Sequence, residues 1–296
     1  MGSRERIISL TAALLTIAVV MLGLELKWAL KSPTPAEWNQ YSNAANEHLY
    51  NHLNKAKPTL SPVVSHRGGS VPGNPSASPL VRLDDNYALG QRLFELDFSW
   101  TSDDQLVIEH DWNNFPTIPT LAKYLAAAPA RRASLSMLYS WLSDHPDAFI
   151  VTDCKKRSLE GCARIRMERP DLVPQFIPQI YQFKDYALVQ SQGFRNIILT
   201  LYRCYSDEPA DSVAQFVAQH ELFALTIPES RADDTDLLTQ ISRLGIPVYV
   251  HTINDAGAAN QILARGVYGI YSDRLTAVDL DKWSQPLTAG ASSGRH

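Results

Sequence analysis

Seven polar residues at the ends of short apolar segments could together perform acid–base and metal chemistry. They are His66, Arg67, Glu95, Asp97, His110, Asp153 and Lys155. Charged side chains beside a core are costly unless they are paired or bound to a metal, so this set is not core filler. Two imidazoles suit a general base and a general acid, and the two cationic groups suit an anionic substrate. The combination indicates metal-assisted cleavage of a phosphodiester.

Two of the segments carry their charged residues in pairs. Glu95 and Asp97 flank a leucine, and Asp153 and Lys155 flank a cysteine. Because side chains alternate between the two faces of a strand, each pair points to one side of its strand. Three carboxylates that converge near one point suit a hard cation, Ca²⁺ or Mg²⁺, better than Zn²⁺.

The position of His110 depends on how the chain turns after Asp97. Only seven residues separate Phe98 from the next apolar segment, which begins at Leu106. Parallel neighbours need a connection of about a dozen residues or more, so these segments form an antiparallel hairpin or a loosely paired excursion. In such a hairpin position 97 lies roughly opposite position 110. We therefore expect His110 to stand beside the carboxylate pair.

The elements that must position these residues are short β-branched or aromatic segments that alternate with amphipathic ones. The nine strand candidates are residues 63–66, 93–98, 106–110, 149–155, 176–181, 196–202, 222–227, 248–253 and 267–272. Without the hairpin segment 106–110, eight strand–helix units fill about 210 residues, which is typical of an α/β fold, the (β/α)₈ TIM barrel. A doubly wound open sheet is the alternative, but no glycine-rich dinucleotide-binding motif follows a strand. In a barrel the active site lies at the C-terminal ends of the strands, where the polar residues are found.

An apolar stretch without charges occupies residues 7–24 and follows Arg4 and Arg6. As a helix its 18 residues span roughly 27 Å, close to the thickness of a bilayer core. No cleavage site with small residues follows it, so we interpret it as an uncleaved transmembrane signal anchor; a cleaved signal peptide and a buried core helix are the alternatives. The positive charges before it favour an extracytoplasmic position, membrane-anchored or secreted after cleavage, for residues 32–296.

We expect four regions along the chain. These are an N-terminal signal anchor or signal peptide at 1–31, a stalk at 32–61, a TIM-barrel phosphodiesterase domain at 62–285 and a flexible tail at 286–296.

The composition is that of a folded protein without general affinity for nucleic acid. Of 296 residues, 45% are hydrophobic and 20% charged, which argues against disorder. The net charge is −4, whereas a nucleic-acid binder needs a basic face. The three cysteines, Cys154, Cys162 and Cys204, imply no disulfide framework. A Cys154–Cys162 bridge stays open in an oxidising compartment.

In these motifs the sequence resembles the glycerophosphodiester phosphodiesterase family, within the superfamily of phosphatidylinositol-specific phospholipase C-like phosphodiesterases. The matching segments are His66-Arg67-Gly68, Glu95-Leu96-Asp97, Thr101 to Asp111, Asp153-Cys154-Lys155 and Gly266 to Asp273. Each motif alone is weak, but the set in this order and spacing is specific.

The resemblance implies a metal-dependent hydrolase that cleaves a glycerophosphodiester to an alcohol and glycerol phosphate. It also implies a role for each residue: acid–base catalysis by His66 and His110, metal binding by Glu95, Asp97 and Asp153, and phosphate binding or support of the metal site by Arg67 and Lys155. The implied cofactor is Ca²⁺ or Mg²⁺, and the implied partner is a small or lipid-derived phosphodiester.

Three departures from the family pattern leave the headgroup open. The segment 73–82 replaces a turn that usually contains an acidic residue, Asp153 stands where glutamate is common, and His251 and Thr252 stand where Trp-Thr is common. Intact or lyso-phospholipids therefore remain alternative substrates, and an inactive barrel that acts as a binding module remains an alternative function. A glycosidase is less suitable, because its two carboxyl groups need neither paired histidines nor a third carboxylate.

Overall fold

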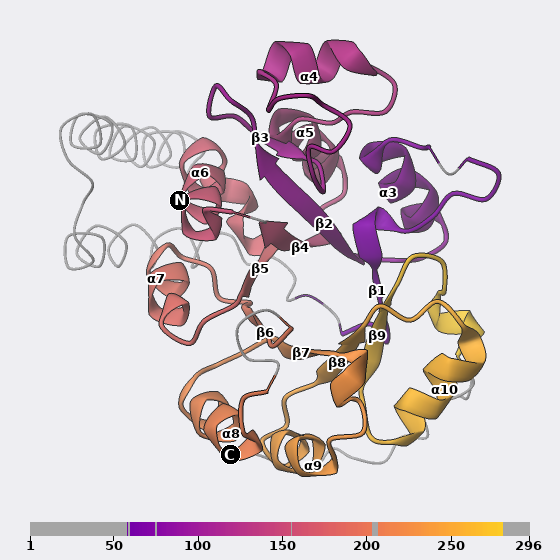
Figure 1. Cartoon of the computed structure of the whole chain (residues 1–296), viewed down its shortest axis with the longest axis vertical. Coiled ribbons are helices and arrows are strands. Elements are labelled where there is room, and N and C mark those ends of the chain that lie inside the picture. The colour runs from indigo at the N-terminus through magenta and orange to yellow at the C-terminus, as the bar shows by residue number, and fades with distance from the viewer. Residues whose placement is uncertain (1–57, 59, 75, 155, 203–206, 281–296) are drawn as a thin grey trace, which may run out of the picture.

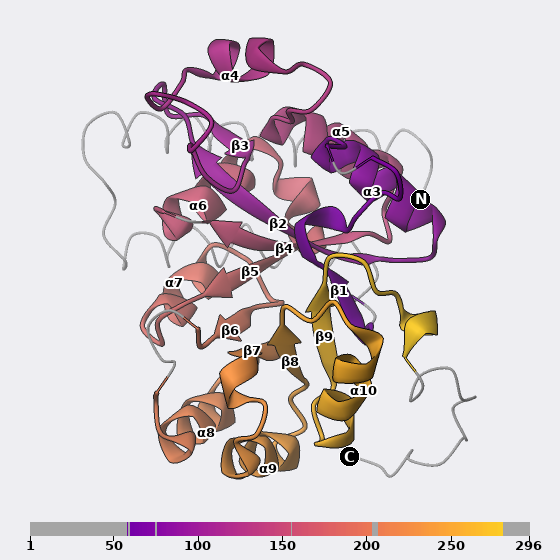
Figure 2. The ribbon, with the colours of Figure 1, turned by 45° about the vertical axis from the view of Figure 1, so that its right-hand side comes forward.

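Eight parallel strands close into a ring in this computed structural model, which describes residues 58, 60–74, 76–154, 156–202 and 207–280. The strands of the ring are β1 (Val63–Ser65), β2 (Leu93–Trp100), β4 (Phe149–Cys154), β5 (Phe176–Ile180), β6 (Ile198–Thr200), β7 (Ala224–Pro228), β8 (Val248–His251) and β9 (Gly269–Ser272). Strand β1 pairs in parallel with both β9 and β2, and this closes the ring (Figure 2). The predicted TIM barrel is confirmed, and the alternative of an open sheet is wrong.

Helices surround the strands (Figure 1). They are α3 (Pro79–Ala88), α4 (Leu121–Ala127), α5 (Leu135–Asp144), α6 (Ser158–Glu168), α7 (Asp185–Ser191), α8 (Ala210–Gln219), α9 (Thr235–Arg243) and α10 (Ala256–Ala264), with short 3₁₀ helices η1 (His66–Gly68), η2 (Pro170–Gln175), η3 (Glu229–Arg231) and η4 (Ala277–Asp279). Several begin at a polar cap: Ser78, Ser134, Asp234 and Asp255 each accept a hydrogen bond from a backbone N–H in the first turn. Such caps satisfy donors that the helix itself leaves without partners.

The strands are apolar on both faces, which explains their continuous hydrophobic character. One small cluster of buried side chains fills the barrel and draws on all eight parallel strands: Val64, Leu93, Phe149, Val151, Ile177, Ile198, Ala224, Tyr249 and Tyr271. The alternate positions, such as Val63, Phe94 and Ile150, belong to a larger cluster that also includes apolar side chains of the helices. Alternation therefore sends Glu95, Asp97 and Asp153 to the inside of the barrel, further along the strands.

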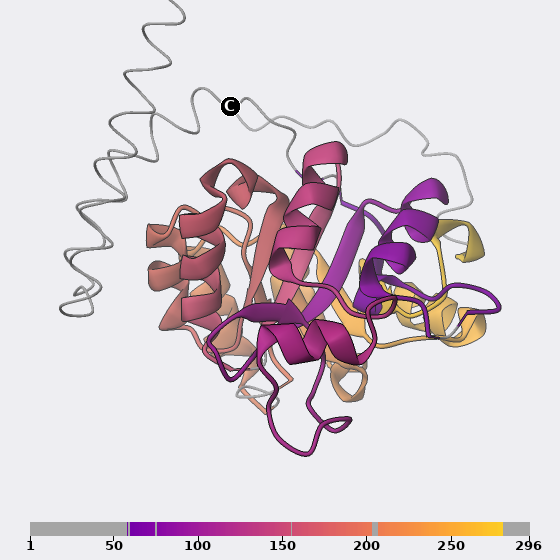
Figure 3. The ribbon, with the colours of Figure 1, turned by 90° about the horizontal axis from the view of Figure 1, so that it is seen from above.

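The ninth strand, β3 (Leu106–Ile108), is antiparallel to β2, as predicted for the hairpin. Its register differs from the expectation by one residue. Trp100 pairs with Leu106, so Asp97 lies opposite Glu109 and not His110, and the Glu109 N–H donates to the Asp97 carbonyl at 3.1 Å. The register differs because β2 continues to Trp100, and the five residues 101–105 are enough to connect it to β3. The segment after β3, including α4, projects beyond the other helices (Figure 3).

The predicted signal anchor and most of the stalk lie outside the described residues. Among the residues that the structure describes, no helix has the length and apolar character needed to cross a bilayer.

Candidate active site

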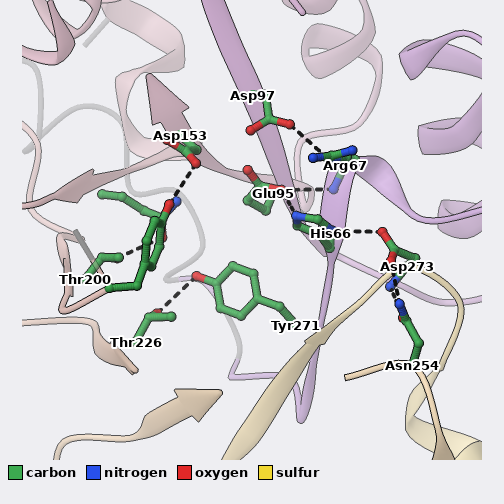
Figure 4. Close-up of polar contacts among 12 residues, drawn as sticks. His66, Arg67, Glu95, Asp97, Asp153, Thr200, Thr226, Asn254, Tyr271 and Asp273 are labelled. Atoms are coloured by element: carbon green, nitrogen blue, oxygen red, sulfur yellow. Dashed lines mark hydrogen bonds and ion pairs between the residues drawn. The ribbon is translucent and has the colours of Figure 1, made fainter. Parts of the chain in front are cut away.

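Three carboxylates meet toward the C-terminal ends of β2 and β4 (Figure 4). Asp97 and Asp153 are Cα partners across these parallel strands, and Glu95 lies two residues before Asp97 on the same face. Each offers one oxygen, and the three oxygens lie within 4.8 Å of one another. The exposed fraction is 2% for Glu95 and 4% for each aspartate. The structure thus brings the three predicted metal ligands together.

This carboxylate cluster fits a divalent cation. Carboxylates this close repel one another, and burial removes the water that would otherwise screen them, so a cation between them is favourable. A set made only of carboxylate oxygens matches the ligand preference of Ca²⁺ or Mg²⁺. Within the described part of the chain, no other three potential ligands are grouped in this way.

A tight turn after β1 places Arg67 against two of these carboxylates. Arg67 lies in η1 with φ 53° and ψ 32°, a left-handed conformation that is uncommon for a residue other than glycine. In this conformation its backbone N–H donates to Oε2 of Glu95 at 2.9 Å. Its Nε lies 3.2 Å from Oδ2 of Asp97. One residue therefore contacts both predicted ligands of β2, through its backbone and its guanidinium.

The next two residues, Gly68 and Gly69, also have positive φ, at 79° and 86°. A Cβ at Gly69 would lie 2.6 Å from Nδ2 of Asn86, a buried side chain of α3. That amide donates to the carbonyl groups of Gly68 at 3.1 Å and Ser70 at 3.2 Å. Only glycine at position 69 leaves room for this amide, which fixes the loop carrying Arg67.

His66 is held between two acidic residues. Its Nδ1 donates to Oδ1 of Asp273 at 2.8 Å, and its Nε2 lies 3.8 Å from Oε2 of Glu95. Asn254 donates to the other oxygen of Asp273 at 2.6 Å (Figure 4). The hydrogen bond from His66 lowers the pKa of Asp273, so the carboxylate stays charged beside the imidazole.

His110 lies just past β3 and makes a matching contact with its neighbour. Its Nδ1 donates to Oδ2 of Asp111 at 2.7 Å, and the backbone N–H of Asn113 donates to Oδ1 at 2.8 Å. The hydrogen bond from His110 is the main cause of a lowered pKa at Asp111, and the charge of Arg67 contributes as well. His66 and His110 thus each donate through Nδ1 to an aspartate, and the expectation that His110 stands beside the carboxylate pair stays a prediction.

Both oxygens of the Asp153 carboxylate accept a hydrogen bond from a tyrosine. The Tyr181 hydroxyl donates to Oδ1, and the Tyr202 hydroxyl donates to Oδ2 at 2.8 Å. The ring of Tyr202 packs against His251, with 4.2 Å between centroids. Its neighbour His251 therefore forms part of the wall behind Asp153.

Lys155 and Cys204 lie outside the described residues, so the role of Lys155 in phosphate binding or support of the metal site stays a prediction. Cys154 and Cys162 are free, buried thiols. Burial raises the pKa of Cys154 to about 12.

The contacts of four site residues were not predicted: Asp273 with His66, Asn254 with Asp273, and Tyr181 and Tyr202 with Asp153. A signal was present for three of them. Tyr181 and Tyr202 end predicted strands, and Asp273 follows the last one. Counting inward positions to the very end of each strand identifies them, because Tyr181 alternates in register with the interior residue Ile177.

Comparison with known proteins links this fold to phosphodiesterases. No family model matches the chain, and no curated protein matches it in sequence. A glycerophosphodiester phosphodiesterase from Thermotoga maritima superposes with a TM-score of 0.58 at 19% identity, over 73% of this chain and 95% of that chain. A glycerophosphoryl diester phosphodiesterase from Parabacteroides distasonis gives 0.59 at 15% identity, over 82% of this chain and 93% of that chain.

A third similar structure is a phosphodiesterase from Oleispira antarctica in complex with the product sn-glycerol-3-phosphate. Its TM-score is 0.50 at 17% identity, over 76% of this chain and 95% of that chain. At these identities the likeness establishes the fold. The structural neighbours named as glycerophosphodiester phosphodiesterases belong to the family that the sequence motifs resemble.

Proposed function

We propose that this chain is a phosphoric diester hydrolase that cleaves glycerophosphodiesters to an alcohol and glycerol phosphate. One observation carries the proposal: the buried cluster of Glu95, Asp97 and Asp153 lies beside the imidazole of His66. The motif resemblance and the structural neighbours supply the substrate class. The neighbour solved with sn-glycerol-3-phosphate supports a glycerol phosphate product for this chain too.

The carboxylate cluster is assigned to a divalent cation, Ca²⁺ or Mg²⁺. When bound there, the cation would offset the negative charge of a phosphate and polarise one of its oxygens. Arg67 is 43% exposed at its side chain, so its guanidinium can meet a phosphate that enters from solvent. We assign Lys155 to the same anionic group.

The two histidines present the same atom to the substrate. Asp273 and Asp111 accept the Nδ1 protons of His66 and His110, which leaves each Nε2 free to exchange a proton. One imidazole takes the proton of the substrate hydroxyl as that hydroxyl attacks the neighbouring phosphorus. The other donates a proton to the leaving alkoxide. Water then opens the cyclic phosphodiester with the two roles exchanged.

We also propose that the segment 7–24 anchors the chain in a membrane and that the barrel lies outside the cytoplasm. The argument is the charge-free apolar stretch after two arginines. Carbonate extraction of membranes and protease protection of intact cells or vesicles test the proposal. Recovery of the full chain in the soluble fraction would contradict the anchor.

A headgroup panel tests the proposed activity. The full chain is incubated with glycerophosphocholine, glycerophosphoethanolamine, glycerophosphoinositol and lysophospholipids, with Ca²⁺, with Mg²⁺ and with a chelator. Release of glycerol phosphate from at least one deacylated substrate, dependent on metal, is the expected result. Cleavage confined to lysolipids would move the substrate to the lipid class. Metal binding without any turnover would favour a binding module.

A further inference from the structure

The three carboxylates contact groups of several kinds. Asp97 lies against a charged guanidinium, that of Arg67, and Glu95 accepts a backbone N–H. Each oxygen of Asp153 accepts a phenolic hydroxyl, from Tyr181 or from Tyr202. In Figure 4, Asp153 lies on the far side of the carboxylate cluster from Arg67.

The two phenols come from the next two strands of the ring. Tyr181 is the residue after β5, and Tyr202 follows β6 by two residues. Their rings meet edge to face at 6.0 Å and 77°. Tyr181 is buried, and Tyr202 is backed by the ring of His251. The hydroxyl groups are therefore fixed by packing before any ligand arrives.

A phenol stabilises a carboxylate without removing its charge. Both hydroxyl groups donate to the carboxylate, and neither carries a positive charge. A lysine or arginine in their place would compete with a cation for the same carboxylate. Two neutral donors add no positive charge to the cluster and limit the rotation of the carboxylate.

Asp153 needs such support because of its position. It stands directly opposite Asp97 on the adjacent strand, and paired like charges repel. Without donors on the other side, the carboxylate would turn away from the point where the three oxygens converge. The phenols hold it there from behind.

We propose that Tyr181 and Tyr202 are positioning residues that preorganise Asp153 for a divalent cation and so set the metal affinity of this site. The inference rests on the proposed metal-dependent function, since it concerns the same carboxylates.

The test measures metal binding separately from turnover. The full-length chain and the variants Tyr181→Phe and Tyr202→Phe are stripped of metal and titrated calorimetrically with CaCl₂ and with MgCl₂. We expect each variant to bind about 10-fold more weakly or worse, since outer partners of metal ligands typically have effects of this size. Turnover of each variant should recover as the metal concentration rises.

Tyr271→Phe is the matched control. Tyr271 is also a buried tyrosine of the barrel interior, but its hydroxyl meets Thr226 at 3.3 Å instead of a carboxylate. The control should bind metal as the wild type does. Thermal unfolding without metal shows whether each variant is folded, and Tyr202→Phe serves if Tyr181→Phe does not fold.

The outcomes separate this inference from the proposed function. If the wild type binds metal and the two phenylalanine variants bind it equally tightly, the positioning role is overturned and the hydrolase proposal stands. If the control weakens binding as much as they do, the effect is general packing and the inference is again overturned. If the wild type binds neither Ca²⁺ nor Mg²⁺, the metal assignment itself fails, and the inference fails with it.

Discussion

The two sides of the carboxylate cluster are built in different ways. Toward β1 and β9, charged groups lie near solvent: the side chains of Arg67, which contacts Asp97, and of Asp273, which contacts His66, are each 43% exposed. Toward β5 and β6, the partners are neutral phenols, and Tyr181 is only 6% exposed. Under the proposed function, the charged side exchanges protons and contacts the anionic substrate, and the side of the phenols holds a metal ligand in place.

The two sides of the carboxylate cluster differ in their exposure to solvent, and therefore in how strongly charges on each side are screened. Charges near solvent are screened, so a substrate can approach and leave without a large change in solvation. A buried carboxylate is much more sensitive to the donors around it. Removal of a group on the charged side should therefore damage turnover, and removal on the neutral side should damage metal affinity.

The largest expected effect is on the charged side. His66→Ala or His110→Ala should lower kcat about 10³-fold, because each change removes a proton-transfer group. Calcium and magnesium titrations should give the wild-type affinity, since neither imidazole is a predicted ligand. His220→Ala is the control: this histidine follows α8 and bonds the Phe216 carbonyl at 2.7 Å, so turnover should persist. Full turnover in both active-site variants would refute the acid–base assignment.

The second prediction concerns Asp153, the carboxylate that the two tyrosines contact. Asp153→Asn removes the charge that Tyr181 and Tyr202 support and should weaken metal binding about 100-fold. Calorimetry of the stripped protein measures the affinity, and thermal unfolding without metal checks the fold. Exhaustive chelation of the wild type should likewise stop turnover, and added metal should restore it. An unchanged affinity in this variant would remove the distinction between the two sides.

The charged side was the more predictable one from sequence. His66, Arg67, Glu95 and Asp97 occupy short motifs, and strand periodicity predicts the shared face of Glu95 and Asp97. The barrel was predictable for the same reason, since nine apolar segments and one short connection leave only eight parallel strands. The register at His110 was missed by one residue because the length of a turn cannot be read from hydrophobicity.

The contacts of Tyr181 and Tyr202 with Asp153 depend on the order of the strands in the closed ring. Tyr181 and Tyr202 are separated from Asp153 by 28 and 49 residues, and only the order of β4, β5 and β6 brings their hydroxyls to one carboxylate. A tyrosine at the end of a strand is common in a core, so its residue type gave no chemical signal. Asp273 likewise meets His66 across 207 residues because β9 pairs with β1.

Asp273 should have a smaller effect on turnover than His66, which it contacts. Asp273→Asn keeps the shape of the side chain but removes the negative charge that orients the His66 ring. We expect kcat to fall about 10-fold with metal affinity unchanged, because Asp273 acts through His66. Steady-state kinetics and calcium titration measure the two quantities. A loss of metal affinity equal to that of Asp153→Asn would show that the two sides do not work separately.

The smallest expected effect is on stability, and its sign follows from the lowered pKa of Asp273. A carboxyl group whose pKa is lower in the folded than in the unfolded state stabilises the fold above its unfolded value, ordinarily near 3.8, and loses that contribution as the pH falls. The free energy of unfolding of the wild type should therefore exceed that of Asp273→Asn by less than about 1 kcal/mol at pH 5, because the side chain is partly screened by water. Urea denaturation at pH 5, 4 and 3 should show this difference shrinking toward pH 3. If the difference in the free energy of unfolding grows between pH 4 and pH 3, the His66–Asp273 contact does not stabilise the ionised carboxylate. The charged side would then lack the fixed anion that distinguishes it from the side of the phenols.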